Sequence, residues 1–309
     1  MRLGLPSLDA ASLPAFLAHR GGLFRQEKVS VQLIYPKPEN VLIQELAGGE
    51  MDLALISPLL ALRAFSQGKP LRAILAPAQR TDLVLVVWGN LRGLEQLSGR
   101  WVLTGGRKSL SWGVLLALLE SRGVEPETVT LIPTDGSRVR KRAFEERVED
   151  AALLRADEAF SIPPTLGERS NLPIAHFMPY LPSYWLLGKE EVLVKRKGEV
   201  LSLVKAIVRA DRLLIQGQGF IPWGVSFFLR KKPALFEAYK QLRAWDVYAP
   251  NGGLSTISLD FVRALALRYG LLGGPVRGDS LLDFRFQEEA IKALGEVSSE
   301  QLMRRRKKK

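Results

Sequence analysis

Apolar positions along the first 90 residues fall into short extended runs separated by helical stretches. The runs at 2–5, 29–35 and 53–56 carry the alternating or continuous apolar residues that are typical of strands. One helix is expected to begin near Ser12, whose hydroxyl can cap the first turn. Another is expected at Ser57, which is followed by a proline at the first helical position. Strands that alternate with helices at this spacing predict a mainly parallel sheet with right-handed crossovers.

The same order of elements begins again after residue 90. Strands are predicted at 101–104, 129–132 and 148–154, and a helix with an apolar stripe is predicted at 110–119. A second α/β unit similar to the first is therefore expected, and the chain as a whole is predicted to form two lobes.

Two further strand-like segments, 174–178 and 184–187, flank a stretch with two prolines, which we interpret as a crossing back to the first lobe. The remainder has helical periodicity, with helices expected near 233–245, 258–269 and 286–294. The expected boundaries are 1–84 with 183–295 for lobe I, 85–182 for lobe II and 296–309 for a basic, disordered tail.

Composition narrows the class of protein. The chain has 309 residues, no cysteine and two histidines, which excludes disulfide frameworks, thiolate metal sites and cysteine nucleophiles. Its 47% hydrophobic and 25% charged residues are typical of a globular protein that buries a core. We expect no metal site, and no cluster of catalytic residues is evident.

The formal net charge of +12 has two parts. Six basic residues form the terminal run 304–309, and without them the basic residues exceed the acidic ones by six. A block of like charge at a chain end is typical of a solvated tail, so no nucleic-acid partner is expected. The remaining excess favours anionic ligands or surfaces.

The first residues, MRLGLP, lack the basic segment and apolar stretch of a secretion signal. If a signal was removed, we expect a periplasmic or extracellular, membrane-associated protein. If this N-terminus is native, we expect a cytoplasmic one.

Loops that follow the predicted strands supply the candidate ligand-binding residues, because open parallel sheets bind ligands beyond the carboxyl ends of their strands. These loops and the crossing segment hold small, hydroxyl-bearing and charged side chains. The candidates are Ser7, Asp9, Ser57, Pro58, Gly106, Arg107, Ser109, Asp135, Ser137, Arg155, Ser183 and Tyr184.

Among the candidate loops, the loop 105–109 has the residues best suited to binding an anion. Its two glycines permit close backbone approach, Ser109 can cap the following helix, and Arg107 and Lys108 favour an anion. Arg107 is the preferred cation because its planar guanidinium matches sulfonate, phosphate or carboxylate. The competing interpretation is a glycine turn with two solvated cations. Elsewhere, Asp9 could pair with a cationic ring or an amine, although a turn and a cap explain it equally well.

Several segments, taken in order and spacing, resemble the periplasmic substrate-binding proteins of ABC importers. The similarity is to the SsuA/THI5-like type, which binds aliphatic sulfonates, nitrate and thiamine precursors. It covers about residues 1–290. The segments are 22–27 (GLFRQE), 45–54 (ELAGGEMDLA), 97–103 (LSGRWVL), 123–129 (GVEPETV) and 149–153 (EDAAL).

The resemblance implies a two-lobed α/β fold of periplasmic-binding-protein type II, with the ligand between the lobes and closure by a hinge movement. It also implies a monomer without cofactor that delivers a small organic molecule, anionic or heteroaromatic, to an ABC permease. Arg155 departs from the family pattern, which often places an aromatic or acidic contact there.

Two other functions stay open. An enzyme on the same fold, such as a menaquinone-pathway-like lyase or dehydratase, needs little more than a carboxylate in an apolar pocket, which Asp9 or Asp135 could supply. A cytoplasmic ligand-sensing domain is the other alternative, suggested by the lack of a secretion signal.

Overall fold

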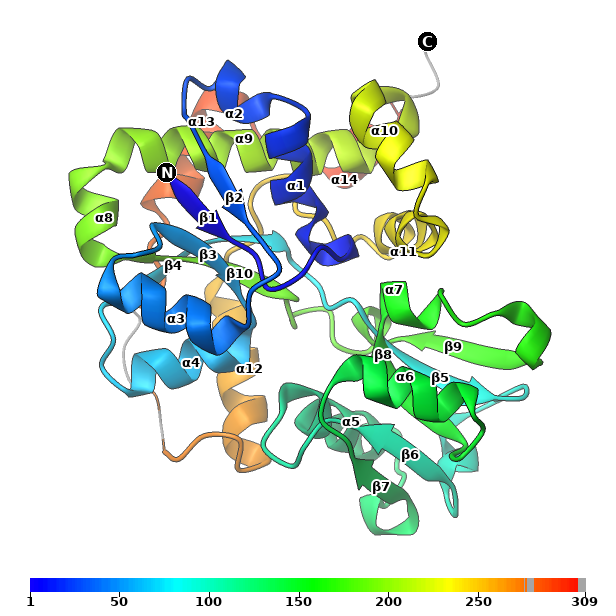
Figure 1. The fold of residues 1–309 in the computed structure, drawn as a ribbon. Helices are drawn as coiled ribbons and strands as arrows, with labels where there is room; N and C mark the ends of the chain where they lie inside the picture. The colour runs from blue at the N-terminus through cyan, green and yellow to red at the C-terminus, as the bar shows by residue number, and fades with distance from the viewer. Residues whose placement is uncertain (275, 277–280, 305–309) are drawn as a thin grey trace.

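The computed structural model describes residues 1–274, 276 and 281–304, and it consists of two lobes, each built on a five-stranded sheet (Figure 1). The sheet of lobe I has the strand order β2-β1-β3-β10-β4. Its strands are β1 (Arg2–Gly4), β2 (Gln32–Ile34), β3 (Leu53–Ile56), β4 (Leu71–Ala78) and β10 (Tyr184–Lys189).

The sheet of lobe II has the order β7-β6-β8-β5-β9. Each sheet is mixed, because three strands run parallel and two pair antiparallel at one side. The strands of lobe II are β5 (Leu83–Trp88), β6 (Trp101–Thr104), β7 (Thr130–Pro133), β8 (Ala151–Arg155) and β9 (Arg169–Pro173).

Helices cover the sheets of both lobes. Lobe II carries α5 (Leu110–Glu120), α6 (Ser137–Glu145) and α7 (Ala156–Ala159). Lobe I carries α1 (Leu13–Arg20), α2 (Leu23–Gln26), α3 (Glu39–Gly48), α4 (Pro58–Ser66), α8 (Glu190–Lys195), α9 (Lys197–Gln216), α10 (Trp223–Arg230), α11 (Pro233–Ala244), α12 (Thr256–Arg268), α13 (Arg285–Leu294) and α14 (Ser299–Arg304). None of the helices in the described ranges is long and apolar enough to cross a membrane.

Strand β3 is buried on both faces, as its continuous apolar sequence predicts. Leu53 and Leu55 belong to the core that also contains α1, α9 and α13, whereas Ala54 and Ile56 belong to the core under α3, α4 and α12. Alternate residues of one strand therefore join the two layers of lobe I.

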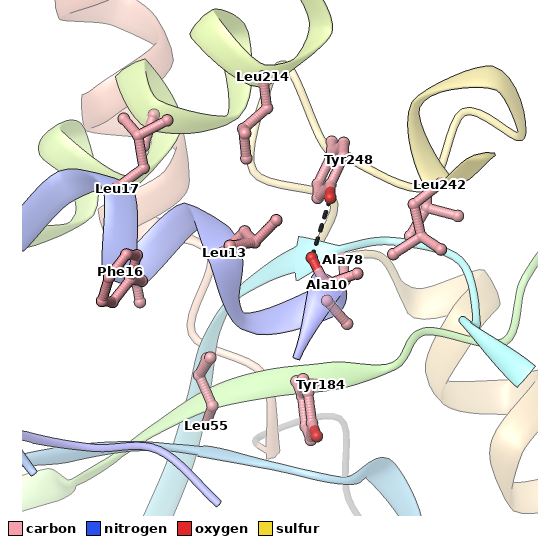
Figure 2. Packing of buried hydrophobic residues seen from close by; sticks show 14 of the residues in the cluster. Ala10, Leu13, Phe16, Leu17, Leu55, Ala78, Tyr184, Leu214, Leu242 and Tyr248 are labelled. Atoms are coloured by element: carbon pink, nitrogen blue, oxygen red, sulfur yellow. Dashed lines mark hydrogen bonds between the residues drawn. The ribbon is translucent and has the colours of Figure 1, made fainter. Parts of the chain in front are cut away.

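Helix α9 supplies much of the first of these layers. Val200, Val204 and Ile207 repeat at helical spacing and are fully buried. The same layer is closed by Tyr248, whose hydroxyl donates to the carbonyl of Ala10 at 2.9 Å (Figure 2). This contact ties the C-terminal half of the chain to the segment that follows β1.

The chain leaves lobe I after β4 and returns at β10, and these two strands are antiparallel neighbours in the sheet, with Ala78 opposite Tyr184. Lobe II is thus inserted between two adjacent strands of lobe I. Two short segments, 79–82 and 174–183, connect the lobes.

Two expectations from the sequence need correction. The strand expected at 174–178 is a 3₁₀ helix, Ile174–His176, which follows β9. Ile174 and Met178 are buried one helical turn apart, and a short apolar run does not distinguish this spacing from a strand.

The second correction concerns the tail. Residues 299–304 form α14, which packs against α9 with Leu302 only 2% exposed. One buried leucine gives this charged segment an attachment to the core. Residues 305–309 of the expected tail lie outside the described residues.

Candidate functional site

A cleft of about 310 Å³ lies between the lobes, at the ends of the parallel strands of both sheets. Lobe I contributes Glu39 and Ser57, and the connecting segments contribute Asp82 and Ser183. The residues from lobe II include Gly105, Gly106, Ser109, Ser111, Asp135, Gly136, Ser137, Arg140 and Arg155. Polar groups from both lobes therefore face one space.

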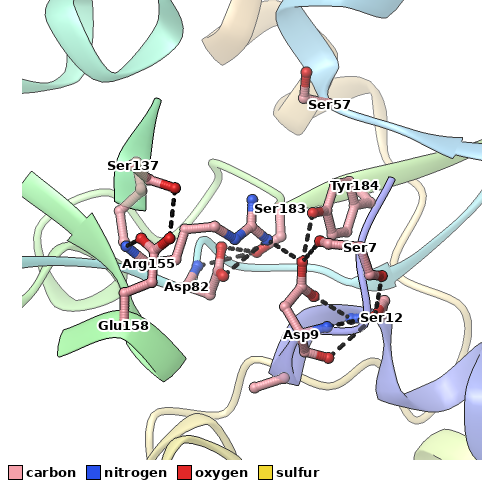
Figure 3. Close-up of polar contacts among 12 residues, drawn as sticks. Ser7, Asp9, Ser12, Ser57, Asp82, Ser137, Arg155, Glu158, Ser183 and Tyr184 are labelled. Atoms are coloured by element: carbon pink, nitrogen blue, oxygen red, sulfur yellow. Dashed lines mark hydrogen bonds and ion pairs between the residues drawn. The ribbon is translucent and has the colours of Figure 1, made fainter. Parts of the chain in front are cut away.

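The structure brings seven of the twelve candidate residues to the wall of this cleft. They are Ser57, Gly106, Ser109, Asp135, Ser137, Arg155 and Ser183. Three others, Ser7, Asp9 and Tyr184, lie behind the wall in a network around Arg155 (Figure 3). Pro58 is buried as the first residue of α4, and Arg107 is exposed.

Arg155, at the end of β8, connects the lobes through two carboxylates. Its Nη2 lies 3.0 Å from Asp9 Oδ2 of lobe I and 2.9 Å from Asp82 Oδ2 of the connecting segment. Its guanidinium carbon lies 5.0 Å from the centre of the Tyr184 ring. Ser183 donates to Asp82 Oδ1 at 3.0 Å. The protein's own carboxylates therefore hold the guanidinium of Arg155 in ion pairs.

Asp9 is almost completely hydrogen-bonded. The Tyr184 hydroxyl donates to Oδ2 at 2.8 Å, and the Ser7 hydroxyl also donates to Oδ2. The Ser12 amide donates to Oδ1 at 2.8 Å. The expectation that the Ser12 hydroxyl caps the first helix is wrong. Ser12 is the N-cap residue of α1, but its side chain makes no capping hydrogen bond and donates instead to the carbonyl of Ser7. The Asp9 carboxylate caps the preceding 3₁₀ turn, Ala10–Ser12, by accepting from the Ser12 amide.

Burial and neighbouring negative charges shift the pKa values of two acidic groups in this network upward. Burial raises the pKa of Asp82 despite the neighbouring Arg155. Burial, together with the charge of Asp9, raises the pKa of Asp157 to about 7. Burial lowers the pKa of Arg155, but the negative charges of Asp82 and Asp9 outweigh burial and raise the pKa well above its usual value. The guanidinium is therefore charged.

Two helices that begin at the cleft have a carboxylate of this chain near their first residues. At α4, the Ser57 hydroxyl donates to Glu39 Oε2 at 2.6 Å. At α6, the Ser137 hydroxyl donates to Glu158 Oε1 at 2.6 Å. Burial raises the pKa of Glu39. Ser57 therefore precedes α4 as expected, but its hydroxyl binds Glu39 and not the helix amides.

The loop 105–109 has the predicted cap but not the predicted cation. Ser109 accepts from the Trp112 amide at 3.2 Å and so caps α5, and Ser111 accepts from the Gly105 amide at 3.1 Å. Arg107 is exposed and does not line the cleft, because its guanidinium lies over the Trp112 ring, 5.3 Å from the centroid. The preference for Arg107 as a ligand-facing cation is not supported by this placement.

Sequence reasoning did not select Glu39, Asp82 or Arg140. Arg140 is buried and donates to the carbonyls of Thr134 at 2.8 Å and Leu153 at 3.1 Å. Asp82 carried one available signal, since it stands directly before β5 and close to the expected lobe boundary between residues 84 and 85. Glu39 and Arg140 lie on helices and become visible only in three dimensions.

The lobes also touch at the rims of the cleft. On one side Arg268 and Tyr269 of lobe I bind Glu120 of lobe II, with Arg268 Nε 3.1 Å and the Tyr269 hydroxyl 2.8 Å from its Oε2. On the other side the rings of Phe160 and Trp245 lie 6.0 Å apart. Residues on both rims thus hold the lobes together around the cleft.

The cleft supplies hydrogen-bonding and charged groups for a small molecule. Within residues 1–274, 276 and 281–304, no group of three or more histidine, aspartate or glutamate side chains is arranged to hold a metal ion. Carboxylates outnumber guanidiniums on the described wall of the cleft.

Comparisons with known proteins give the same architecture. The family model described as NMT1/THI5 like matches residues 10–217. The alkanesulfonate-binding protein SsuA from Xanthomonas axonopodis pv. citri, bound to MOPS, is similar with a TM-score of 0.70 and 19% identity. The match covers 92% of this chain and 98% of that one. No curated protein sequence matches the chain.

Two further structures widen the range of functions found on this fold. The putative periplasmic sulfonate-binding protein SsuA from Methylobacillus flagellatus KT has a TM-score of 0.70 and 15% identity, over 95% of this chain and 94% of that one. The desulfurization enzyme DszB has a TM-score of 0.62 and 12% identity, over 95% and 99%. These similarities show the periplasmic-binding-protein fold, which serves both binding proteins and an enzyme.

Proposed function

The chain belongs to the NMT1/THI5-like family, and from this premise we propose that it is a solute-binding protein that captures a small organic molecule between its two lobes. The observation that carries the proposal is the cleft itself, whose polar wall comes from both lobes and from the connecting segments. The segments 79–82 and 174–183 that join the lobes are short, and hinge closure about such segments is a common way to enclose a ligand.

The proposed role includes delivery of the solute to an ABC importer, as a monomer on the outer side of a membrane. It is supported by membership of the family and by the likeness in fold to SsuA proteins. Both are consistent with a protein that binds and releases its solute unchanged.

The enzyme alternative depends on a carboxylate that can take up a proton from a substrate. Asp9 is poorly suited to this, because it is 2% exposed and already accepts three hydrogen bonds besides its ion pair with Arg155. Asp135 remains as the carboxylate for that alternative. Turnover of a candidate precursor that is abolished in Asp135→Asn would favour it.

The test of solute binding is native mass spectrometry of the purified protein, followed by denaturation and identification of any small molecule released. A panel of solutes is then tested by thermal unfolding. A ligand at 100 times its dissociation constant should stabilise the protein by about 2.7 kcal/mol.

A matched pair of variants places the binding in the cleft. A Cβ at Gly106 would lie 3.1 Å from Asp135 Oδ1, so Gly106→Leu should obstruct the cleft and abolish the stabilisation. Gly219, which has open space around it, gives the control Gly219→Leu. Equal stabilisation of both variants, or no released molecule and no stabilisation by any solute, would contradict the proposal.

A further inference from the structure

The charges around the cleft suggest the class of solute. We infer that the solute carries a positive charge, as an organic ammonium or amidinium does, and that this charge binds between Glu39 of lobe I and Asp135 of lobe II. The inference rests on the proposed function, and it differs from the anionic solute that the basic composition of the chain favours.

Carboxylates of this chain lie at places in the cleft where an anion would bind. Helix N-termini attract anions, and α4, α5 and α6 all begin at the cleft. At α5 the Ser109 hydroxyl accepts from the Trp112 amide. At α4 the carboxylate of Glu39 is already held by Ser57, and at α6 the carboxylate of Glu158 is held by Ser137. The chain therefore places its own anions at two of these three helix N-termini and a serine cap at the third.

The cations of the cleft wall, Arg140 and Arg155, already have partners in the protein. Arg155 is paired with Asp9 and Asp82, and Arg140 is buried and donates to two carbonyl groups. The described lining residues include no lysine and no third arginine. To bind Arg155, an anionic solute would have to break an existing ion pair, which is costly because it leaves buried carboxylates unpaired. Arg140 has no ion pair in the described part of the chain, but the charges of Glu158 and Asp135 already act on it.

Two carboxylates of the cleft wall can accept further hydrogen bonds from a ligand. Asp135 is exposed to the cleft and has no hydrogen bond or ion pair within the described part of the chain. Glu39 receives one side-chain hydrogen bond, whereas a carboxylate has sites for about four. These two groups belong to different lobes, so a cation between them would also favour closure.

A buried oxygen supports the same assignment. Asp82 lines the cleft, is 2% exposed, and its Oδ2 accepts no hydrogen bond of normal geometry, although Arg155 lies close to it. Because burial also raises the pKa of Glu39, the described side chains compensate its negative charge incompletely. A positive group in the cleft would compensate both.

The experiment uses matched probes that differ only in charge. Benzylammonium, benzyl alcohol and phenylmethanesulfonate form one series, and butylammonium, butanol and butanesulfonate form a second. Each is tested at equal concentration for its effect on the Tm of the full chain. The ammonium members should raise the Tm, and the sulfonates should not.

Charge-neutralising variants then test the two residues. Glu39→Gln and Asp135→Asn should each weaken binding of the ammonium probe at least about tenfold, as expected for loss of a charged hydrogen-bond partner. Asp260→Asn makes the same chemical change at an exposed position of α12, away from the cleft, and should leave the affinity unchanged.

The outcomes separate this inference from the function on which it rests. If sulfonates raise the Tm and ammonium probes do not, solute binding stands and the charge of the solute is wrong. If ammonium binding persists in both Glu39→Gln and Asp135→Asn, the assigned site is wrong. If no probe binds and no small molecule is released in native mass spectrometry, the proposed function fails as well.

Discussion

Asp211 is a fully buried carboxyl group on α9, far in sequence from any residue of the cleft. No group in the described ranges gives its oxygens a hydrogen bond of normal geometry, and the nearby Ala249 amide donates to the carbonyl of Pro77. Burial therefore raises the pKa of Asp211 well above its usual range. In the folded protein this side chain holds its proton at a pH where the unfolded chain has lost it.

This predicts a stability that depends on pH. Because the folded pKa is raised, the folded state binds the proton more tightly, and the free energy of unfolding falls as pH rises above the unfolded pKa of about 4. Asp211→Asn should remove this fall. As pH rises, the free energy of unfolding of the variant should increase relative to that of the natural protein by up to about 1.4 kcal/mol per pH unit, until the raised pKa is reached.

The measurement is urea denaturation of both proteins between pH 5 and pH 8, with Asp260→Asn as the exposed control. A difference in stability that stays constant over this range would contradict the assignment of a raised pKa to Asp211.

Among the elements, helix α5 begins at the cleft and is stabilised at its first turn by a single side-chain cap. Ser109 caps its first turn, so Ser109→Ala should lower the free energy of unfolding by about 1 kcal/mol. Ser226 lies inside α10 and has no side-chain hydrogen bond among the described residues, so Ser226→Ala serves as the control. Equal urea denaturation midpoints for the two variants would show that the cap contributes little.

Elements were predicted better than the contacts between them. The apolar run of β3 and the cap at Ser109 depend on neighbours in sequence, and both were correctly predicted. The pairing of Arg155 with Asp9 joins residues in different lobes, and no local pattern encodes it. The outward direction of Arg107 depends on Trp112 and on the turn of the loop, which the spacing of residues does not determine.

Seven candidates reach the cleft because strand ends can be located from periodicity. Glu39 and Asp82 were not predicted as site residues, because Glu39 lies on a helix and Asp82 lies in a connecting segment. The expectation of an anionic solute arose from the net charge, from the loop 105–109 and from the family resemblance, whereas the described wall of the cleft has three carboxylates and two guanidiniums. Net charge describes the whole surface and does not give the charge at one site.

At the scale of the whole molecule, Arg155 couples the lobes. Arg155→Met would leave Asp9 and Asp82 buried without their partner and should lower the free energy of unfolding by about 3–5 kcal/mol. In the double variant Arg155→Met with Asp82→Asn, one of the two carboxylates is also neutralised. The loss should therefore be smaller than the sum of the single effects, as a double-mutant cycle would reveal. Strictly additive losses would argue against coupling.

The lobes should also move when solute binds. Since the chain has no cysteine, Val139→Cys in lobe II and Val194→Cys in lobe I would be the only thiols, and both positions are exposed. Energy transfer between dyes at these sites should change on addition of a solute that raises the Tm. A pair within lobe I, Val194→Cys and Ile257→Cys, should give no change. An unchanged signal from both pairs would contradict hinge closure.

The insertion of lobe II between β4 and β10 has a consequence for biosynthesis. Strand β10 lies between β3 and β4, so the sheet of lobe I is incomplete until the whole of lobe II has left the ribosome. The strands of lobe II, in contrast, all come from the contiguous segment 83–173. Local contacts form sooner than distant ones. The emerging chain therefore completes lobe II before lobe I. Until β10 is synthesised, strands β1–β4 lack the partner that joins β3 to β4, and their apolar faces stay uncovered.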